Sequence, residues 1–212
     1  MHSMDQGSAE WFAARLGKAT ASKIADIIAK TKSGVSASRA TYAGQLIAER
    51  LSGTPTESFS NGSMQWGTDN EAAARDAYAA HHLCEVVEVG FADHPTIPMS
   101  GASPDGLVGD DGLVEIKCPN SATHIDTLLK KAIPSKYVTQ MMWQMACTGR
   151  KWCDFASFDP RLPEHMQLIV IRLDRSDEWI SEIEAEVAKF LSEIDDKVAA
   201  LREQYEPQRE AA

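Results

Sequence analysis

Two acidic residues and one lysine around a predicted β-hairpin could carry metal-dependent chemistry. The segment 103–119 reads SPDGLVGDDGLVEIKCP. Alternate residues of a strand share a face, so Glu115 and Lys117 are expected to point the same way. The turn signal at 109–112 folds the preceding strand, which begins just after Asp105, back beside them. The spacing therefore predicts that Asp105 and Glu115 approach each other across the hairpin.

Hard carboxylate oxygens brought together in this way favour Mg²⁺ or Mn²⁺. The backbone carbonyl of Ile116 is a further candidate ligand, and the ammonium of Lys117 would orient or help deprotonate a water. A metal and an activated water that face a phosphodiester form a hydrolytic nuclease centre. Glu71, one turn into the helix expected over 66–82, could complete the metal shell. The alternative is an exposed acid at each position, which is common for such residues taken singly.

The elements that must position these residues follow from the periodicity of the chain. Helices are expected over 8–15, from Thr20 onward, and over 38–51, 66–82, 121–131, 134–147 and 176–205, with a polar loop over 31–37. Strands are expected over 85–91, 97–102, 106–108, 113–117, 152–158 and 167–173. This order predicts an α/β fold, with a central mixed β-sheet flanked by helices.

Length and composition limit the remaining possibilities. The chain has 212 residues, 43% of them hydrophobic and 25% charged, as in ordinary soluble domains. We expect one nuclease domain over 1–212, with residues 1–7 a tag or disordered and 206–212 a frayed tail. No apolar run is long enough to span a bilayer, and the N-terminus does not resemble a secretion signal. These features predict a cytoplasmic protein with no membrane partner, whose 4 cysteines are reduced.

The net charge of −10 hides an uneven distribution. Residues 61–120 carry 10 acidic against 2 basic residues, whereas the segments on either side, 1–60 and 121–175, are mildly basic. An acidic chain is not a whole-surface polyanion binder. The pattern suggests a carboxylate-rich metal centre between two phosphate-facing segments, but on charge alone an ordinary acidic soluble protein is the favoured interpretation.

Several segments, in this order, resemble the phage lambda-type (YqaJ-like) recombination exonucleases of the PD-(D/E)XK, restriction-endonuclease-like superfamily. They are RLGKATAS (15–22), WGTDNE (66–71), SPDGL with LVEIKCP (103–107 and 113–119) and YVTQ (137–140), with a further echo in FDPR (158–161). The resemblance extends from residue 11 to about residue 205. It implies a restriction-endonuclease-like core.

The resemblance also implies roles at the active centre. Asp105, Glu115 and the Ile116 carbonyl would be metal ligands, and Glu71 would complete a site for two Mg²⁺ ions, with Mn²⁺ as a substitute. Lys117 would position the nucleophilic water. The remaining active-site role, support from a helix glutamine, belongs to Gln140.

The DNA-binding roles implied by the resemblance lie elsewhere in the chain. Arg15 would bind the 5′-phosphate of a DNA end, with the hydroxyls of Ser22 and Ser103 as further contacts. Ser22 is expected near a helix start, where backbone N–H groups favour an anion. Met64 would be an apolar wedge between the two strands. Lys32 would reach the groove of the downstream duplex, more loosely than an arginine because lysine lacks the planar fork.

The implied activity is that of a Mg²⁺-dependent, ATP-independent, alkaline-type 5′→3′ exonuclease. It would digest the 5′-ended strand of duplex DNA to mononucleotides and leave a 3′ single-stranded tail. The implied assembly is a homotrimeric ring that encloses the duplex and hands the tail to a phage single-strand annealing protein in the bacterial host cytoplasm. Two alternatives stay open: a structure- or sequence-specific endonuclease of the same superfamily, and a DNA-end-binding module whose metal site is vestigial. The presence of all four active-site side chains disfavours the second.

Overall fold

The computed structural model describes residues 4–31, 34–56 and 62–205, without the side chains of residues 63 and 64. The helices are α1 (Ala9–Arg15), α2 (Ile24–Ile28), α3 (Ala37–Ser52), α4 (Gly62–His82), α5 (Ser121–Lys130), α6 (Ser135–Thr148) and α7 (Asp177–Tyr205), with 3₁₀ turns η1 (Ala21–Lys23) and η2 (Glu164–Met166). The strands are β1 (Ala19–Thr20), β2 (Lys30–Thr31), β3 (Gly34–Val35), β4 (Val86–Val87), β5 (Ala92–Asp93), β6 (Ser100–Ala102), β7 (Gly106–Val108), β8 (Gly112–Lys117), β9 (Trp152–Phe158) and β10 (Leu168–Asp174). No helix of these ranges is long and apolar enough to cross a membrane.

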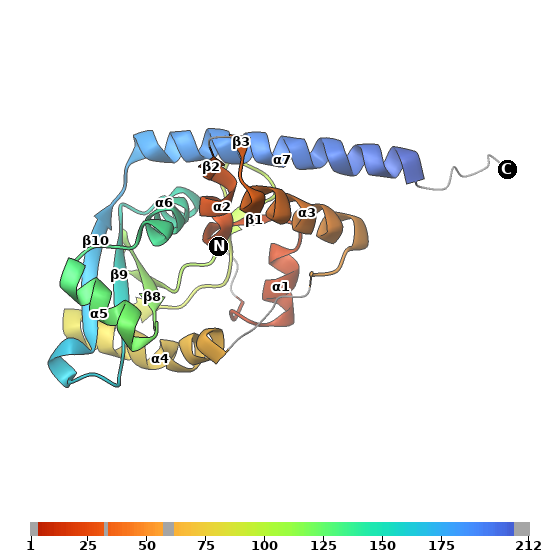
Figure 1. Ribbon diagram of the computed structural model, residues 1–212. Helices are drawn as coiled ribbons and strands as arrows, with labels where there is room; N and C mark the ends of the chain where they lie inside the picture. The colour runs from red at the N-terminus through yellow and green to blue at the C-terminus, as the bar shows by residue number, and fades with distance from the viewer. Residues whose placement is uncertain (1–3, 32–33, 57–61, 206–212) are drawn as a thin grey trace.

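The central sheet has five strands in the order β10-β9-β8-β7-β4 (Figure 1). Strands β8 and β9 are parallel, and their neighbours pair antiparallel. The expected mixed sheet is therefore confirmed. In the β7–β8 hairpin, Gly106 pairs with Val114 and Val108 pairs with Gly112, so the predicted turn is also present.

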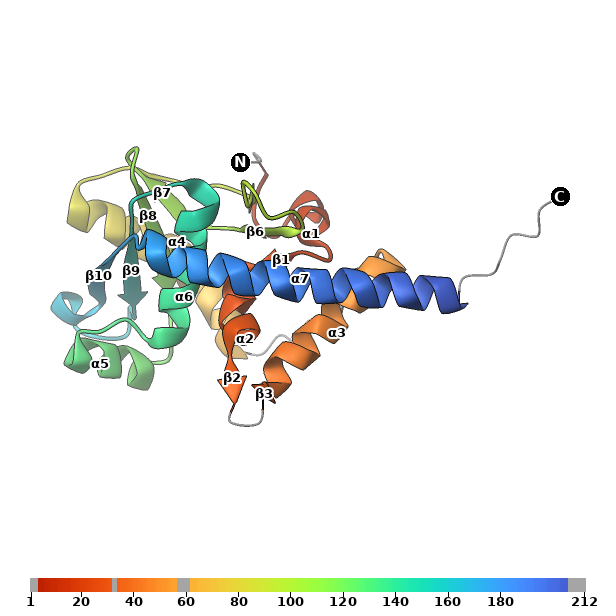
Figure 2. The same ribbon diagram turned by 90° about the horizontal axis from the view of Figure 1, so that it is seen from above.

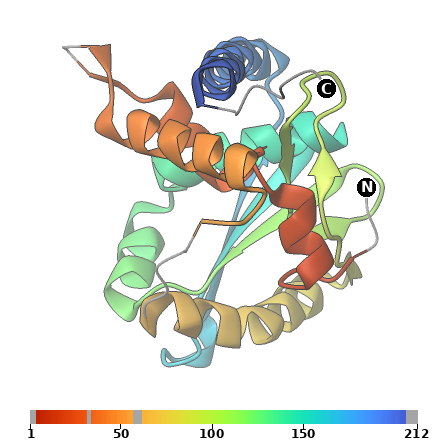
Figure 3. The ribbon, with the colours of Figure 1, turned by 90° about the vertical axis from the view of Figure 1, so that its right-hand side faces the viewer.

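Helices cover both faces of this sheet. Helix α4 contacts β8, β9 and β10 on one face, and α6 lies on the other, with α7 beyond it (Figures 1 and 3). Figure 2 is seen from the side of α7, which crosses α6, α2 and α3 and forms with them the helical layer on this face. Strand β8 serves both layers because Leu113 joins the core beneath α6, whereas Val114 and Ile116 join the core beneath α4.

A second, three-stranded sheet brings the N-terminal segment to the hairpin. Its order is β1-β6-β5, and β1 pairs parallel with β6. Because β6 leads directly into the loop before β7, this pairing places the segment between α1 and α2 beside residues 103–105. The sheet therefore carries the segment 15–22 to the predicted acidic centre.

Five local expectations differ from the structure. The helix expected from Thr20 is replaced by β1, η1 and the five-residue α2, because Ala19 and Thr20 pair with the backbone of β6. The strand expected over 85–91 shrinks to Val86–Val87, which pair with only two residues of the three-residue β7. The strand expected over 97–102 is only Ser100–Ala102.

The other two differences concern the segments around α3 and α4. Part of the loop expected over 31–37 forms the short antiparallel pair β2–β3, which extends one residue before it, to Lys30. Helix α4 begins at Gly62 rather than at residue 66, since residues 63–66 contain no glycine or proline to stop it. Glu71 therefore lies in the middle of this helix and not one turn from its start.

Candidate active site

The β7–β8 hairpin brings the two predicted acids together. One step beyond the pairing of Gly106 with Val114, residues 105 and 115 are opposite each other. Oδ2 of Asp105 accepts a 2.7 Å hydrogen bond from the backbone N–H of Ile116. The glycine after Asp105 is required here because a Cβ at Gly106 would overlap a methyl group of Val86 on the neighbouring strand.

Lys117 lies between the two carboxylates. Its Nζ forms an ion pair with Oε1 of Glu115 and is 3.9 Å from Oδ2 of Asp105. Burial opposes the charge of Lys117, but Glu115 and Asp105 together raise its pKa above the usual value. The two carboxylates thus favour the ammonium form of Lys117, which can hold an anionic oxygen or a water.

Asp105 is the acid whose ionisation is opposed. Burial, followed by the negative charge of Glu115, raises the pKa of Asp105 to about 8, although Lys117 and the Ile116 N–H act in the opposite direction. The charge of Glu71 also raises the pKa of Asp105. The carboxylates of Asp105, Glu115 and Glu71 are thus near enough to influence one another electrostatically.

Glu115 is fully buried and is held by two glutamines of α6. Nε2 of Gln140 donates to Oε1 of Glu115 at 2.5 Å, and Nε2 of Gln144 donates to Oε2 at 2.6 Å. The resemblance identified Gln140 but not Gln144. The spacing of four residues on a predicted helix is the signal that could have found it, because such residues lie on one face.

Glu71 reaches the centre from α4, on the opposite face of β8. Its Oε1 accepts a 3.2 Å hydrogen bond from Arg75, whose guanidinium also contacts Glu88 at 2.7 Å. Across the described ranges, no three His, Cys, Asp or Glu side chains are close enough to hold a metal ion. The acids are thus not arranged as a complete ligand set.

The donor chemistry nevertheless fits a divalent cation. Carboxylate oxygens and a backbone carbonyl are the ligands that Mg²⁺ accepts. The charges of Glu115 and Glu71 both act on the buried Asp105, and a bound cation would offset their repulsion. Asp105, Glu115 and the Ile116 carbonyl would hold the ion, and Glu71 would join them from α4.

A small cavity of about 150 Å³ adjoins the acids. Its walls come from the N-terminal segment, η1, the loop before β7 and α6, and its lining residues are Gln6, Trp11, Arg15, Ala21, Ser22, Ser103 and Gln140. Three predicted phosphate contacts, Arg15, Ser22 and Ser103, therefore share one cavity. Gln140 belongs both to this cavity and to the hydrogen-bond network of Glu115.

The geometry of the cavity suits an anion. Nη1 of Arg15 and Nε1 of Trp11 donate to Oγ of Ser103, at 3.1 and 2.9 Å. Ser103 therefore accepts two hydrogen bonds and can turn its own hydroxyl hydrogen toward a ligand. The guanidinium of Arg15 lies 4.0 Å from the centre of the Trp11 ring, and burial lowers the pKa of Arg15 below its usual value.

The position of Ser22 differs from the expected one. It is exposed and lies in the three-residue turn η1, so no helix dipole supports an anion there. Trp11 and Gln6, by contrast, were missed by sequence reasoning. Gln6 donates to the backbone carbonyls of Val89 and Pro104, which ties the N-terminal segment to the loop before β7.

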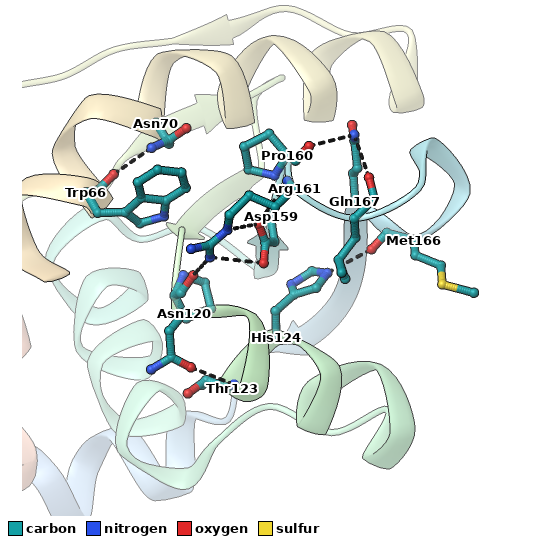
Figure 4. A network of polar contacts seen from close by, with 12 residues as sticks. Trp66, Asn70, Asn120, Thr123, His124, Asp159, Pro160, Arg161, Met166 and Gln167 are labelled. Carbon is teal, nitrogen blue, oxygen red and sulfur yellow. Dashed lines mark hydrogen bonds and ion pairs between the residues drawn. The ribbon is translucent and has the colours of Figure 1, made fainter.

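The FDPR segment (158–161) forms a network of polar contacts beside the end of β8, which we call the Arg161 brace (Figure 4). Arg161 forms hydrogen bonds with both carboxylate oxygens of Asp159 and with the carbonyl of Pro119, two residues after Lys117. Its guanidinium stacks on Trp66 of α4, 4.3 Å from the ring centre. This network links the end of β8 to the helix that carries Glu71.

Two predicted DNA contacts cannot be placed. Lys32 lies outside the described residues, and the side chain of Met64 is among those that the structure does not describe. The groove contact and the wedge stay predictions.

Comparisons with known proteins identify the family of the chain. The model of the YqaJ-like viral recombinase domain matches residues 10–151. An alkaline exonuclease from Laribacter hongkongensis is 51% identical, with a TM-score of 0.88 over 93% of this chain and 97% of that one. The same enzyme has been solved in complex with dAMP, with the same identity, coverage and TM-score.

A phage-related exonuclease from Haemophilus somnus 129PT shares the fold at 16% identity, with a TM-score of 0.72 over 87% of this chain and 96% of that one. No curated protein matches the sequence. The matched domain covers the α1 arginine, the Asp105–Glu115–Lys117 hairpin and the α6 glutamines described above, and the chain belongs to the YqaJ-like viral recombinase family of lambda-exonuclease-type nucleases.

Proposed function

We propose that the protein is a Mg²⁺-dependent, ATP-independent 5′→3′ exonuclease of duplex DNA. It digests the 5′-ended strand to mononucleotides and leaves a 3′ single-stranded tail for annealing-dependent recombination. The observation that carries this proposal is the position of Gln140. One side chain belongs both to a cavity with an arginine suited to a terminal phosphate and to the network that holds Glu115.

Each group of the chain has a separate task in this reaction. Arg15 and Ser103 bind the 5′-phosphate, which fixes the strand end, since a guanidinium offers a planar fork to phosphate oxygens. Asp105 and Glu115 hold divalent ions, which when bound lower the pKa of a water and stabilise the leaving 3′-oxygen. Lys117 orients the water or the scissile phosphate.

The relatives support the substrate class. The similar enzyme from Laribacter hongkongensis is an alkaline exonuclease that has been crystallised with dAMP, a 5′-mononucleotide. The same product class is expected for this chain. A homotrimeric ring around the duplex would let an acidic protein remain on DNA by enclosure, because its net charge of −10 does not favour binding by charge alone. The 3′ tail would pass to a phage single-strand annealing protein in the bacterial cytoplasm.

The test uses a linear, 5′-phosphorylated duplex that is labelled at one end. With Mg²⁺ we expect release of labelled mononucleotide from the 5′ end and a lasting 3′ strand, and with EDTA no release. Glu115→Gln should abolish release and keep the fold, whereas Asp110→Asn, an exposed acid on the same hairpin, should leave it unchanged. Undiminished hydrolysis by the Glu115 variant would reject the metal assignment.

Closed circular duplex separates exonuclease from endonuclease. An enzyme that starts from the end pocket leaves this substrate intact, whereas a structure- or sequence-specific endonuclease cuts it. Sedimentation of the active protein tests the ring, because a stable and active monomer would exclude enclosure.

A further inference from the structure

We propose that Gln144 is a positioning residue of the acidic centre, which orients Glu115 for a divalent ion without contacting the DNA. This inference rests on the proposed metal-dependent function. It assigns separate tasks to two glutamines that lie one turn apart on α6. Gln140 serves both the phosphate cavity and Glu115, and Gln144 serves Glu115 alone.

The orientation of Gln144 is determined by its neighbours. The side chain is fully buried, and Nε2 donates to Oε2 of Glu115 at 2.6 Å. Its Oε1 faces the thiol of Cys153, at 3.9 Å from Sγ. Turning the amide over would set a carbonyl oxygen against the carboxylate and an N–H toward the thiol. The amide is therefore fixed with its donor toward Glu115.

The two oxygens of Glu115 have different partners. Oε1 contacts both Lys117 and Gln140. Among the described residues, Oε2 accepts a hydrogen bond from Gln144 only. Loss of the Gln144 amide would leave the buried Oε2 without a donor, so the carboxylate would be held at Oε1 alone and its orientation would be less well defined.

Contact with the substrate also differs between the two glutamines. Gln140 lines the cavity with Arg15 and Ser103, whereas Gln144 lies one turn further along α6, away from that cavity and against β9. A 5′-phosphate in the cavity can reach Gln140. Gln144 is fully buried, so it acts on the reaction only through Glu115.

A ligand carboxylate that loses an outer hydrogen-bond partner loses roughly 10–100-fold in metal affinity or activity. We therefore expect Gln144→Met, which keeps the volume and removes the amide, to weaken Mn²⁺ and Mg²⁺ binding by about this factor. The measurement is calorimetric titration of the DNA-free protein with each metal. It does not depend on nuclease activity.

Kinetics supply a second signature. For Gln144→Met we expect a lower kcat at fixed Mg²⁺, partial recovery as Mg²⁺ is raised, and an unchanged KM for DNA. The preference for 5′-phosphorylated over 5′-hydroxyl ends should equal that of the parent protein. The matched variant Gln140→Met should change this preference, because Gln140 lines the cavity.

Met145→Leu, a buried and volume-conserving change on the same helix, controls for repacking and should leave metal affinity unchanged. If Gln144→Met does not fold, Gln144→Asn, whose amide is one methylene too short, takes its place. A folded Gln144 variant with parental metal affinity would overturn the proposal, as would one that loses the 5′-phosphate preference. If the parent itself neither binds metal nor digests linear DNA, the proposed function fails, and this inference fails with it.

Discussion

The backbone N–H of Ile116 donates a 2.7 Å hydrogen bond to Oδ2 of Asp105, so the side chain of Asp105 continues the hairpin beyond its last backbone pair. This bond fixes one carboxylate oxygen beside Glu115 and Lys117. It also places an acid where burial and the charge of Glu115 raise its pKa to about 8. The hydrogen bond that positions Asp105 thus also holds its carboxyl group where ionisation is disfavoured.

The first prediction concerns the stability of the metal-free protein against pH. An acid whose folded-state pKa is raised favours the fold at low pH, and this contribution is lost as pH rises from about 4 through about 8. Asp105→Asn keeps an acceptor for Ile116 and removes the charge. The Tm of this variant should exceed that of the parent above pH 8, and the difference should disappear toward pH 4.

Thermal melts in EDTA across this range provide the measurement. Added Mg²⁺ should raise the Tm of the parent and leave that of Asp105→Asn unchanged, because binding to the folded state alone stabilises it. A difference in Tm that does not vary with pH would contradict the raised pKa of Asp105.

The second prediction concerns the end pocket. Arg15→Ala should reduce the preference for 5′-phosphorylated over 5′-hydroxyl ends by about 10-fold or more, because each 1.4 kcal/mol of lost charge-assisted bonding is a factor of about ten. Arg15→Lys should retain part of the preference, since it keeps the charge and loses the fork. Paired kcat/KM values on the two substrates measure the ratio, and equal ratios in mutant and parent would remove Arg15 from the pocket.

The third prediction concerns Gly106. Because a Cβ at this position would overlap Val86, Gly106→Ala should destabilise the protein by about 1–3 kcal/mol through overpacking. Val86→Ala removes the obstructing methyl group and should restore much of the loss in the double variant. Chemical denaturation of the four proteins forms the cycle, and additive losses would show that the two side chains do not meet.

The fourth prediction concerns the Arg161 brace, in which Arg161 binds Asp159 near the end of β8. Burial opposes the charge of Asp159, but hydrogen bonds from Arg161 and Ser121 outweigh it and lower the pKa of Asp159 to about 2. An acid with a lowered pKa stabilises the fold above about pH 4, and this contribution is lost as pH falls through about 2. Arg161→Met should therefore lower the Tm at pH 7, and the difference in Tm from the parent should narrow as the solution is acidified. A difference in Tm that does not change with pH would show that Arg161 does not lower the pKa of Asp159.

The sequence predicted the hairpin well because its chemistry is local. A turn signal, alternate residues and a short separation determine that Asp105, Glu115 and Lys117 meet, with no knowledge of the remaining chain. The contacts from helices are less accessible. Glu71 and Gln144 approach β8 from opposite faces, and the rotation of a helix on a sheet depends on the whole packed layer.

The short elements show a second limit of local patterns. Thr20 is in a strand because a distant segment, β6, pairs with it, and this partner leaves no mark on residues 19–28. The partnership of Glu71 with Arg75 does leave a mark, a spacing of four residues on a helix, but only the structure shows that Glu88 shares the same guanidinium.

Gln140 lines the phosphate cavity and also binds Glu115, so one helix relates the positions of the two sites. In the proposed reaction, α6 would contact both the 5′-phosphate and the carboxylate beside the scissile bond, so the protein and not the base would set the distance between them. Digestion would then proceed one nucleotide at a time whatever the base. The number of nucleotides removed in each step would change only if the distance between α1 and α6 changed.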